Sequence, residues 1–270
     1  MNVMMLLEMA AQGFGERVAF VNGQESLTYQ QLFAAAGRAA MHLRNSDCKH
    51  VAMLDVSSLA LPIALFASAW AGMPFVPINY RLTDAEVDAL LQRIQPTMLV
   101  TDETRIESLP DMDAVAPLER GAFVGLSIKG EGAAANDWTM DPDEIAVLLF
   151  TSGTTGAPKA AVLRHRHLVS YMFSAAEFGA AAEDDVALVA VPPYHIAGVI
   201  SVISSVYAGR RVVQLPNFNA RAWLELARRE KVTTAFLVPT MLAQIVRELE
   251  GSSADLPHLS ALSYGGGKMP

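Results

Sequence analysis

The segment Thr151–Lys159, Thr-Ser-Gly-Thr-Thr-Gly-Ala-Pro-Lys, holds the residues with the clearest chemical purpose in this chain. It combines four hydroxyl side chains, two glycines and one lysine within nine residues. Glycine lets backbone N–H groups approach a ligand closely and adopt positive φ. Hydroxyls and an ammonium add hydrogen-bond donors, and successive loop amides can form a concavity that binds anions. The segment therefore predicts a loop that binds the oxygens of a polyphosphate.

This segment differs from the Walker phosphate loop. The Walker pattern needs Gly, four residues and then Gly-Lys-Ser/Thr, whereas here Gly156 is followed by Ala157-Pro158, and Lys159 by Ala160. The structural alternative is an ordinary Gly/Ser/Thr surface loop between a strand and a helix, with Lys159 solvated at the start of that helix. A lysine directly behind Gly-x-Pro favours the phosphate-binding interpretation.

Three histidines could also take part in chemistry. His195 follows Pro-Pro-Tyr and precedes Gly198; the alternative for it is a core histidine whose ring is hydrogen-bonded to backbone. His165 and His167 could suggest a metal site, but residues two apart do not share a helical face. We therefore expect these two to be exposed or in contact with the loop. No metal-ligand cluster is visible in the sequence.

The elements that must position the loop can be read on either side of it. The uninterrupted apolar run Ile145–Phe150 predicts a buried strand that ends at the loop. His165–Gly179 predicts a helix after the loop, and Leu262–Tyr264 a short final strand. Gly121–Pro142 is rich in glycine and alanine and poorly periodic, which predicts a linker or a change of sheet.

Strands and helices alternate through the rest of the chain. Thr28–Gln31 and Thr83–Glu86 are capping boxes, each followed by apolar residues at helical spacing. Such alternation implies parallel strands with right-handed crossovers. The predicted strands are 51–56, 75–78, 97–101, 186–191, 211–215 and 233–238, and the predicted helices include 60–71, 196–207, 220–229 and the segment from Pro239 through Leu249.

Composition excludes several classes of protein. The chain has 270 residues, of which 52% are hydrophobic and 18% charged, so a globular fold with an ample core is expected. Its net charge is −8, without a dense Lys/Arg block, so we expect no nucleic-acid partner. The single cysteine, Cys48, excludes an internal disulfide and fits a reducing cytoplasm.

Two stretches, 56–80 and 187–209, are long and apolar enough to be compared with membrane spans. Both contain proline and glycine and read better as alternating buried strands and helices, so no membrane span is predicted. The first twelve residues, MNVMMLLEMAAQ, lack a basic region and include Glu8. They predict an amphipathic helix and not a signal peptide.

The loop closely resembles the phosphate loop of the adenylate-forming superfamily, which includes acyl-CoA synthetases, aryl-CoA ligases, luciferases and peptide-synthetase adenylation domains. Further segments resemble motifs of that family in the expected order along the chain: Leu27–Leu32, Ala71–Asn79 with Arg81–Thr83, Val162–Leu168, Pro192–Gly198 and Tyr264–Pro270. The resemblance implies an α/β fold, with two packed, mostly parallel sheets flanked by helices, as in the N-terminal domain of an acyl-CoA synthetase.

The resemblance also implies roles for particular residues. The β- and γ-phosphates of ATP would be bound by four hydroxyls and two loop amides: Thr151, Ser152, Thr154, Thr155, Gly153 and Gly156. Lys159 would contact phosphate or pin the loop; it is not the family's catalytic lysine, which lies in the C-terminal domain. With Thr151 and Lys159, His195 completes the residues expected to act in catalysis.

A substrate pocket and an adenine site are implied in the same way. His195 would lie beside the substrate carboxylate or gate the acyl tunnel, in a pocket that includes Tyr194, Gly198 and Tyr264. The backbone of Gly265, Gly266 and Gly267 would border adenine, although a plain glycine turn is the alternative there. Relatives that activate amino acids place an Asp in the pocket motif, whereas 194–200 holds no carboxylate. This favours a fatty or aromatic acid.

The implied reaction is the attack of a carboxylate on the α-phosphorus of ATP, which yields an acyl-adenylate and pyrophosphate, followed by thioester formation with coenzyme A. A carboxylate is already ionised at neutral pH, so the work is positioning and charge neutralisation. ATP, Mg²⁺ and coenzyme A are therefore the expected co-substrates and cofactors. The family's metal-ligating Glu is not in this sequence, so no metal ligand is assigned.

Family members run to roughly twice this length, so residues 1–270 are interpreted as an incomplete N-terminal AMP-binding domain, with subdomains at about 1–140 and 141–270 and without the C-terminal lid domain. We expect the fragment alone to be inactive. An uncovered sheet edge would invite association, including a homodimer. The alternatives are a non-catalytic nucleotide- or acyl-binding module and an adenylation domain that loads a carrier protein.

Overall fold

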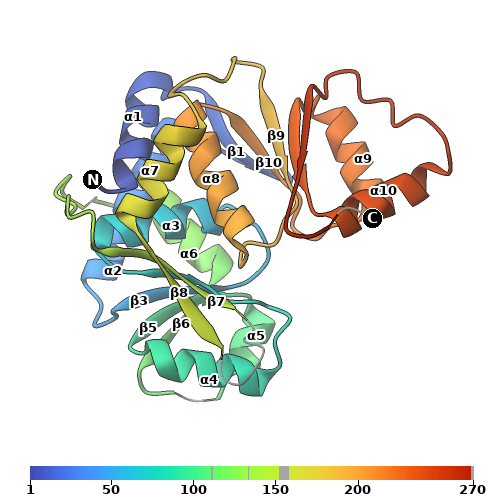
Figure 1. The fold of residues 1–270 in the computed structure, drawn as a ribbon. Coiled ribbons are helices and arrows are strands. Elements are labelled where there is room, and N and C mark those ends of the chain that lie inside the picture. The colour runs from blue at the N-terminus through green and yellow to red at the C-terminus, as the bar shows by residue number, and fades with distance from the viewer. Residues whose placement is uncertain (111, 133, 152–157, 269–270) are drawn as a thin grey trace.

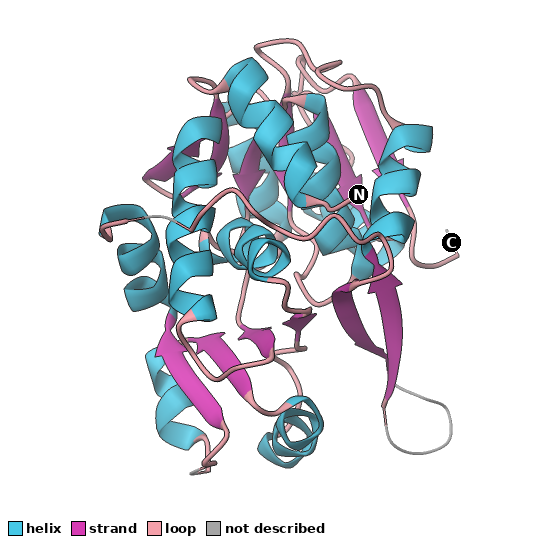
Figure 2. Cartoon of the chain, turned by 90° about the vertical axis from the view of Figure 1, so that its left-hand side faces the viewer, coloured by secondary structure: helices cyan, strands magenta, loops and turns pink. Residues whose placement is uncertain are grey.

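The computed structural model describes residues 1–110, 112–132, 134–151 and 158–268. Over these residues the chain forms two mostly parallel sheets flanked by helices, which confirms the predicted fold class (Figures 1 and 2). Figure 1 shows five layers, in which helices lie outside each sheet and a central group of helices lies between the two sheets. The layered arrangement follows from the βαβ alternation, because each crossover places a helix on a face of its sheet.

One sheet, here called sheet A, combines the start of the chain with its C-terminal part. Its strand order is β12-β11-β9-β10-β1-β2, and only the β1–β2 hairpin is antiparallel. Its strands are β1 (Val18–Asn22), β2 (Glu25–Thr28), β9 (Val186–Val189), β10 (Arg211–Gln214), β11 (Thr234–Leu237) and β12 (Ala261–Tyr264).

The other sheet, sheet B, carries the predicted phosphate loop. Its strand order is β6-β5-β3-β4-β7-β8, and every neighbouring pair is parallel except β7 with β8. Its strands are β3 (His50–Leu54), β4 (Phe75–Pro77), β5 (Thr97–Thr101), β6 (Val115–Glu119), β7 (Ile145–Thr151) and β8 (Lys159–Arg164).

Helices separate and cover the two sheets (Figure 1). The central layer holds α1 (Met4–Phe14), α2 (Tyr29–Arg44), α3 (Ala60–Ala71), α6 (Arg120–Lys129), α7 (His165–Ala175) and α8 (Ile196–Ala208). The outer face of sheet B is covered by α4 (Asp84–Ile94) and α5 (Glu103–Ser108), and that of sheet A by α9 (Ala220–Arg229) and α10 (Pro239–Leu249). No helix among the described residues has both the length and the apolar character needed to cross a bilayer.

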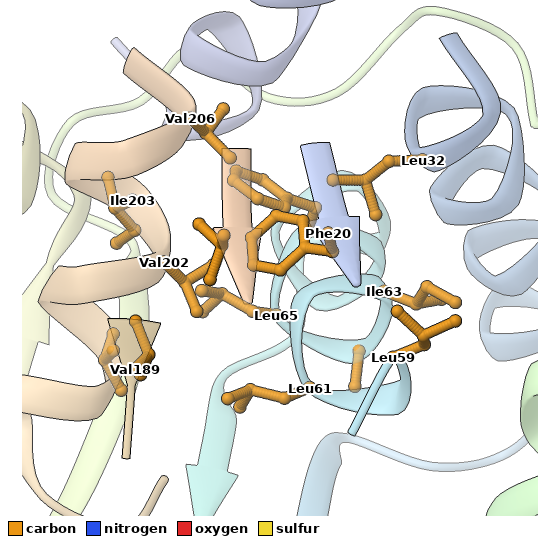
Figure 3. Close-up of a cluster of buried hydrophobic side chains, with 14 of the residues drawn as sticks. Phe20, Leu32, Leu59, Leu61, Ile63, Leu65, Val189, Val202, Ile203 and Val206 are labelled. Carbon is orange, nitrogen blue, oxygen red and sulfur yellow. The ribbon is translucent and has the colours of Figure 1, made fainter. Parts of the chain in front are cut away.

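The core follows from the alternation of side chains along the strands. In β3, Val51 and Met53 face the main core, whereas Ala52 and Leu54 face a second cluster under α4. The main core is continuous between the sheets. Figure 3 shows Phe20 of β1 beside apolar residues of α3 and α8. Both faces of β3 are therefore buried, which explains its nearly continuous apolar sequence.

The two predicted capping boxes are confirmed. At α2, the Thr28 hydroxyl accepts a hydrogen bond from Gln31 N at 3.2 Å, and Thr28 N donates to Gln31 Oε1 at 2.9 Å. At α4, the Thr83 hydroxyl accepts from Glu86 N at 3.4 Å, and Thr83 N donates to Glu86 Oε2 at 2.9 Å. Each box therefore satisfies two backbone groups that a helix start would leave unpaired.

The linker or sheet change predicted for 121–142 is wrong in part. Residues 120–129 form α6, because the Glu119 carboxylate accepts from Ala122 N at 2.7 Å and Phe123 is buried on the core side. The following strand, β7, pairs with β4 and stays in sheet B. The chain changes sheet after β2 and again after β8. The division into subdomains near residue 140 stays a prediction, and sheet membership does not follow it.

Candidate functional site

The strands β7 and β8 form an antiparallel hairpin, and the predicted phosphate loop connects them at what we call its loop end. Thr151 ends β7, Lys159 begins β8, and the two residues are register partners. The Thr151 hydroxyl donates to the Lys159 carbonyl oxygen at 3.4 Å. The predicted phosphate contacts between them, Ser152, Gly153, Thr154, Thr155 and Gly156, lie outside the described residues. The structure therefore places both ends of the predicted loop side by side.

The helix predicted after the loop begins at His165, as expected, and ends at Ala175. Between the loop and this helix the chain forms a strand that was not predicted, and Lys159 starts this strand. Lys159–Arg164 forms the last strand of sheet B and is largely accessible to solvent. Because this strand lies at the sheet edge and buries little, its Lys-Ala-Ala-Val-Leu-Arg sequence lacks the apolar alternation from which strands are recognised. The Lys159 side chain is exposed, next to the predicted loop.

The turn Pro192–His195, which belongs to the predicted substrate pocket, leads into α8. His195 caps this helix with extended backbone, φ −98° and ψ 151°, and its carbonyl oxygen accepts from Gly198 N at 2.9 Å. A Cβ atom on Gly198 would lie 2.6 Å from the Pro192 carbonyl oxygen. Gly198 is therefore needed so that the turn can fold back on α8, and it shapes the site through backbone packing.

A cavity of about 510 Å³ lies at the loop end of the hairpin and is lined by three predicted site residues. Thr151, Tyr194 and His195 line it, together with Pro158, which adjoins Lys159. We call it the hairpin cavity. The other lining residues were not predicted to be site residues; they are Asn79, Leu82, Glu86, Leu90, Leu149, Phe150, Ala161, Leu163 and Ile196.

Strand pairing explains why these distant segments meet. Phe75 of β4 is the parallel partner of Val147 on β7, so the carboxyl ends of the two strands lie at one edge of sheet B. Asn79, just beyond β4, and Thr151, at the end of β7, therefore reach the same cavity. In open α/β sheets this edge is where ligands bind. Asn79 belongs to the Ala71–Asn79 motif, which was a signal for its involvement.

Tyr80, Tyr194 and His195 form a group of packed rings, of which Tyr194 and His195 line the cavity. The Tyr194 ring packs edge-on against Tyr80 with centroids 5.2 Å apart, and its centroid lies 4.5 Å from that of the His195 ring. Desolvation and then the Arg81 guanidinium lower the pKa of His195, while burial raises the pKa of Tyr194. Both side chains are therefore uncharged at neutral pH and can hydrogen-bond without adding net charge.

The predicted adenine segment follows β12 at the edge of sheet A. The Tyr264 side chain is exposed, Gly265 N donates to Leu237 O at 3.4 Å, and Gly266 has a φ of +79°, which favours glycine. The described lining of the hairpin cavity includes none of Tyr264, Gly265, Gly266, Gly267 or Gly198. Their roles toward adenine and acyl group stay predictions.

A second cavity, also of about 510 Å³, lies next to that segment. Its floor is formed by β9, β11 and β12, and α8 covers one side. Ser263, which precedes Tyr264, lines this second cavity, as do Ile200 and Phe236. The turn at His195 leads into α8 and so connects the two cavities through one element.

His165 and His167 differ from each other as their spacing predicted, but His165 is not where we expected it. His165 is 1% exposed and its Nδ1 accepts from Val3 N at 3.3 Å, so it belongs to the packing of the N-terminal segment and not to the loop. His167 is exposed, and its Nδ1 accepts from Arg164 N at 3.2 Å. Among the described residues, no group of three His, Cys, Asp or Glu side chains could hold a metal ion.

A sequence model of the AMP-binding enzyme family matches residues 7–270 of this chain. Feruloyl-CoA synthase from Amycolatopsis sp. is 33% identical over 257 residues, which cover 92% of this chain and 51% of that protein. Fatty acid–[acyl-carrier-protein] ligase ScoC from Streptomyces coeruleorubidus is 33% identical over 253 residues, which cover 89% of this chain and 49% of that protein. The chain thus spans about half the length of the curated relatives it matches.

Solved structures support the same relationship. The inhibitor-bound N-terminal domain of FACL13 from Mycobacterium tuberculosis has a TM-score of 0.85 and 25% identity, with 100% of this chain and 71% of that chain covered. The o-succinylbenzoate CoA synthetase MenE from Bacillus subtilis, in complex with the acyl-adenylate OSB-AMP, has a TM-score of 0.81 and 26% identity, with 98% of this chain and 54% of that chain covered.

Proposed function

Because this chain belongs to the AMP-binding enzyme family, we propose that it is the N-terminal part of an ATP-dependent carboxylic acid:CoA ligase. The complete protein would first join a carboxylate to AMP with release of pyrophosphate, and then transfer the acyl group to the thiol of coenzyme A. The observation that supports this most directly is the hairpin cavity, where the end of β7 meets the turn that carries Tyr194 and His195.

The loop end of the β7–β8 hairpin would bind the phosphates. The Thr151 hydroxyl and the Lys159 ammonium suit phosphate oxygens as a donor and a positive charge, and they lie at adjacent strand ends. The loop residues Ser152 to Gly156 would add hydroxyls and amides. These groups would fix the β- and γ-phosphates, so that the carboxylate can attack the α-phosphorus from the side opposite the leaving pyrophosphate, whose bond to that phosphorus breaks.

The His195 turn would orient the acid. Its imidazole is neutral and borders the hairpin cavity, so it can hydrogen-bond to a substrate carboxylate oxygen at the site of attack. The second cavity would hold the rest of the acid, because it begins beside α8 and includes apolar side chains such as Ile200 and Phe236. The absence of a carboxylate between 194 and 200 supports an acid without an amino group, fatty or aromatic.

The nucleotide would require a divalent cation. Mg²⁺, when bound, would neutralise the phosphate charge that develops on the leaving pyrophosphate. Among the described residues no group of three His, Cys, Asp or Glu side chains could hold it, and no protein ligand is assigned to it.

We also propose a cytoplasmic location, a part in fatty-acid metabolism and a homodimer for the complete protein. The buried free thiol of Cys48 is consistent with a reducing compartment.

Pyrophosphate exchange tests this function. The complete protein, given ATP, labelled pyrophosphate and a panel of fatty, aromatic and amino acids, is expected to exchange label only with acids that lack an amino group. Thr154→Ala should lower the exchange rate by about 10²–10³-fold, the cost of removing one well-aimed donor. ATP binding without exchange for any acid would instead support a non-catalytic nucleotide-binding module, and the absence of ATP binding would contradict the proposal.

A carrier-protein ligase is the second candidate, and one relative favours it. ScoC, which is named as a fatty acid–[acyl-carrier-protein] ligase, is as similar to this chain, at 33% identity, as feruloyl-CoA synthase is. The two functions share adenylation and differ only in the acceptor thiol. Incubation of the complete protein with its acid, ATP and either coenzyme A or a phosphopantetheinylated carrier protein would distinguish them by the thioester that forms.

A further inference from the structure

Arg93, on α4, contacts both sides of the β7–β8 hairpin at its loop end. Its guanidinium carbon lies 5.0 Å from the centre of the Phe150 ring on β7. Its Nη1 donates a hydrogen bond of 2.5 Å to the Pro158 carbonyl oxygen, just before β8. Phe150 and Pro158 each adjoin a residue predicted to contact phosphate, Thr151 and Lys159 respectively. One side chain thus ties the end of β7 to the start of β8.

The helix that carries Arg93 is well fixed beside the hairpin cavity. Glu86, Leu90 and Arg93 are spaced four and three residues apart, so they share one face of α4, and the first two line the cavity. The adjoining face carries Val87 and Leu91, which are fully buried against sheet B. Because α4 is anchored by its own core, Arg93 can act as a fixed support for the hairpin.

On the basis of the proposed function, we propose that Arg93 is a positioning residue for nucleotide binding. It holds the two strand ends together and so sets the separation of Thr151 and Lys159. A guanidinium suits this role, because its flat face stacks on an aromatic ring while its edge donates hydrogen bonds. A lysine ammonium is a point charge on a flexible stem and cannot make both contacts in one fixed geometry.

A different role is open to the same side chain and can be separated by experiment. Arg93 is exposed, so its charge could attract phosphate directly without holding the hairpin. Lysine keeps that charge, so Arg93→Lys would then bind nucleotide nearly as well as the wild type. In a positioning role, Arg93→Lys instead resembles Arg93→Ala. The two variants together therefore discriminate between charge and position.

Calorimetric titration with ATP and Mg²⁺ gives the first test. We expect Arg93→Ala and Arg93→Lys each to raise the Kd for ATP by about three- to tenfold, the range for losing one charged hydrogen bond and one exposed cation–π contact. Arg221→Ala is the matched control, because it removes an exposed arginine of α9 that pairs with Glu248; its Kd should match the wild type. An unchanged Kd in Arg93→Ala, or a wild-type Kd in Arg93→Lys, would overturn the proposal.

The second test needs no nucleotide and so separates this proposal from the proposed function. The test measures hydrogen exchange of the backbone amides of β7 and β8 nearest the loop end, such as those of Thr151 and Ala160. These amides should exchange about three- to tenfold faster in Arg93→Ala than in the wild type. Phe150→Leu, which removes the ring under the guanidinium, should accelerate the same amides, and the double variant should add little. Equal exchange rates in the wild type and in Arg93→Ala would refute the positioning role of Arg93. Faster exchange in Arg93→Ala, together with a wild type that binds no ATP, would refute only the proposed function.

Discussion

The chemistry of single residues depends here on whether their side chains reach a cavity or the core. His195 and His165 illustrate the difference. His195 borders the hairpin cavity, whereas His165 is enclosed beneath the N-terminal segment and accepts a hydrogen bond from Val3 N. The sequence could place His195 in a turn, and family resemblance could suggest its role. The burial of His165 could not be predicted, because it depends on residues more than 160 positions away.

The buried His165 should make stability depend on pH. Burial, and then the charge of the Met1 amino group, lower its pKa from 6.5 to about 4 in the folded chain. The unfolded chain therefore binds more protons between these values, so stability is complete above about pH 6.5 and falls as the pH is lowered toward 4. The loss should reach about 3 kcal/mol, measurable by urea unfolding at a series of pH values.

Two variants isolate the contribution of His165. His165→Gln keeps an acceptor for Val3 N but does not titrate, so its unfolding free energy should lose most of this dependence between pH 6.5 and 4. His167→Gln makes the same change at an exposed position two residues later and should retain it. Parallel curves for wild type and His165→Gln over this range would show that His165 is not the group responsible.

His195→Ala tests the role of the turn in orienting the acid. Loss of the imidazole should lower kcat/KM for the carboxylic acid in the complete protein by about tenfold or more, while the Kd for ATP changes little, since we propose that the phosphates bind at the hairpin. His258→Ala, at an exposed position after α10, is the control and should leave both unchanged. A rise in the Kd for ATP with unaltered kcat/KM for the acid would assign His195 to the nucleotide instead.

At the scale of elements, helices with local start signals were predictable, whereas β8 was not. The capping boxes and apolar spacing of α2 and α4 are local signals, and both helices begin where those signals predict. β8 buries little of its sequence, so nothing local marks it as a strand. Its identity as a strand depends on pairing with β7. The same pairing places Lys159 opposite Thr151, which local pattern alone does not reveal.

The two capping boxes provide a matched pair of variants. Thr83→Ala and Thr28→Ala each remove a hydroxyl that caps a helix, and each should lower the free energy of unfolding by about 1 kcal/mol. Of these two helices, α4 carries residues that line the hairpin cavity and α2 carries none. We therefore expect Thr83→Ala to raise the Kd for ATP and Thr28→Ala to leave it unchanged, as measured by calorimetry. Equal nucleotide affinity in both variants would indicate that the position of α4 does not matter for binding.

At the scale of the whole molecule, one core joins the two sheets. The main cluster contains residues from β1, β9 and β10 of sheet A and from β3, β5 and β7 of sheet B, with α1, α2 and α3 between them. Sequence patterns predicted parallel α/β units and, through resemblance, two packed sheets. They could not predict that the first hairpin joins the C-terminal strands, because that is a long-range pairing of β1 with β10.

This shared core predicts a single unfolding transition. Trp70, in α3, and Trp223, in α9, are both almost fully buried in it. Variants with one tryptophan each, obtained by replacing the others with Phe, should give the same urea midpoint by fluorescence, and that midpoint should match circular dichroism. Two separated midpoints would show that the parts of the chain unfold independently, as subdomains divided near residue 140 would.

We propose above all that the loop end of the β7–β8 hairpin and the turn before α8 form one adenylation site. A crystal structure of the chain with a non-hydrolysable acyl-adenylate analogue, an acyl sulfamoyl adenosine, tests it most directly. We expect density for the sulfamoyl group in the hairpin cavity, between Thr151 and His195, with the acyl group extending along α8. Density for the analogue elsewhere, with both of these side chains free of contact to it, would contradict the account.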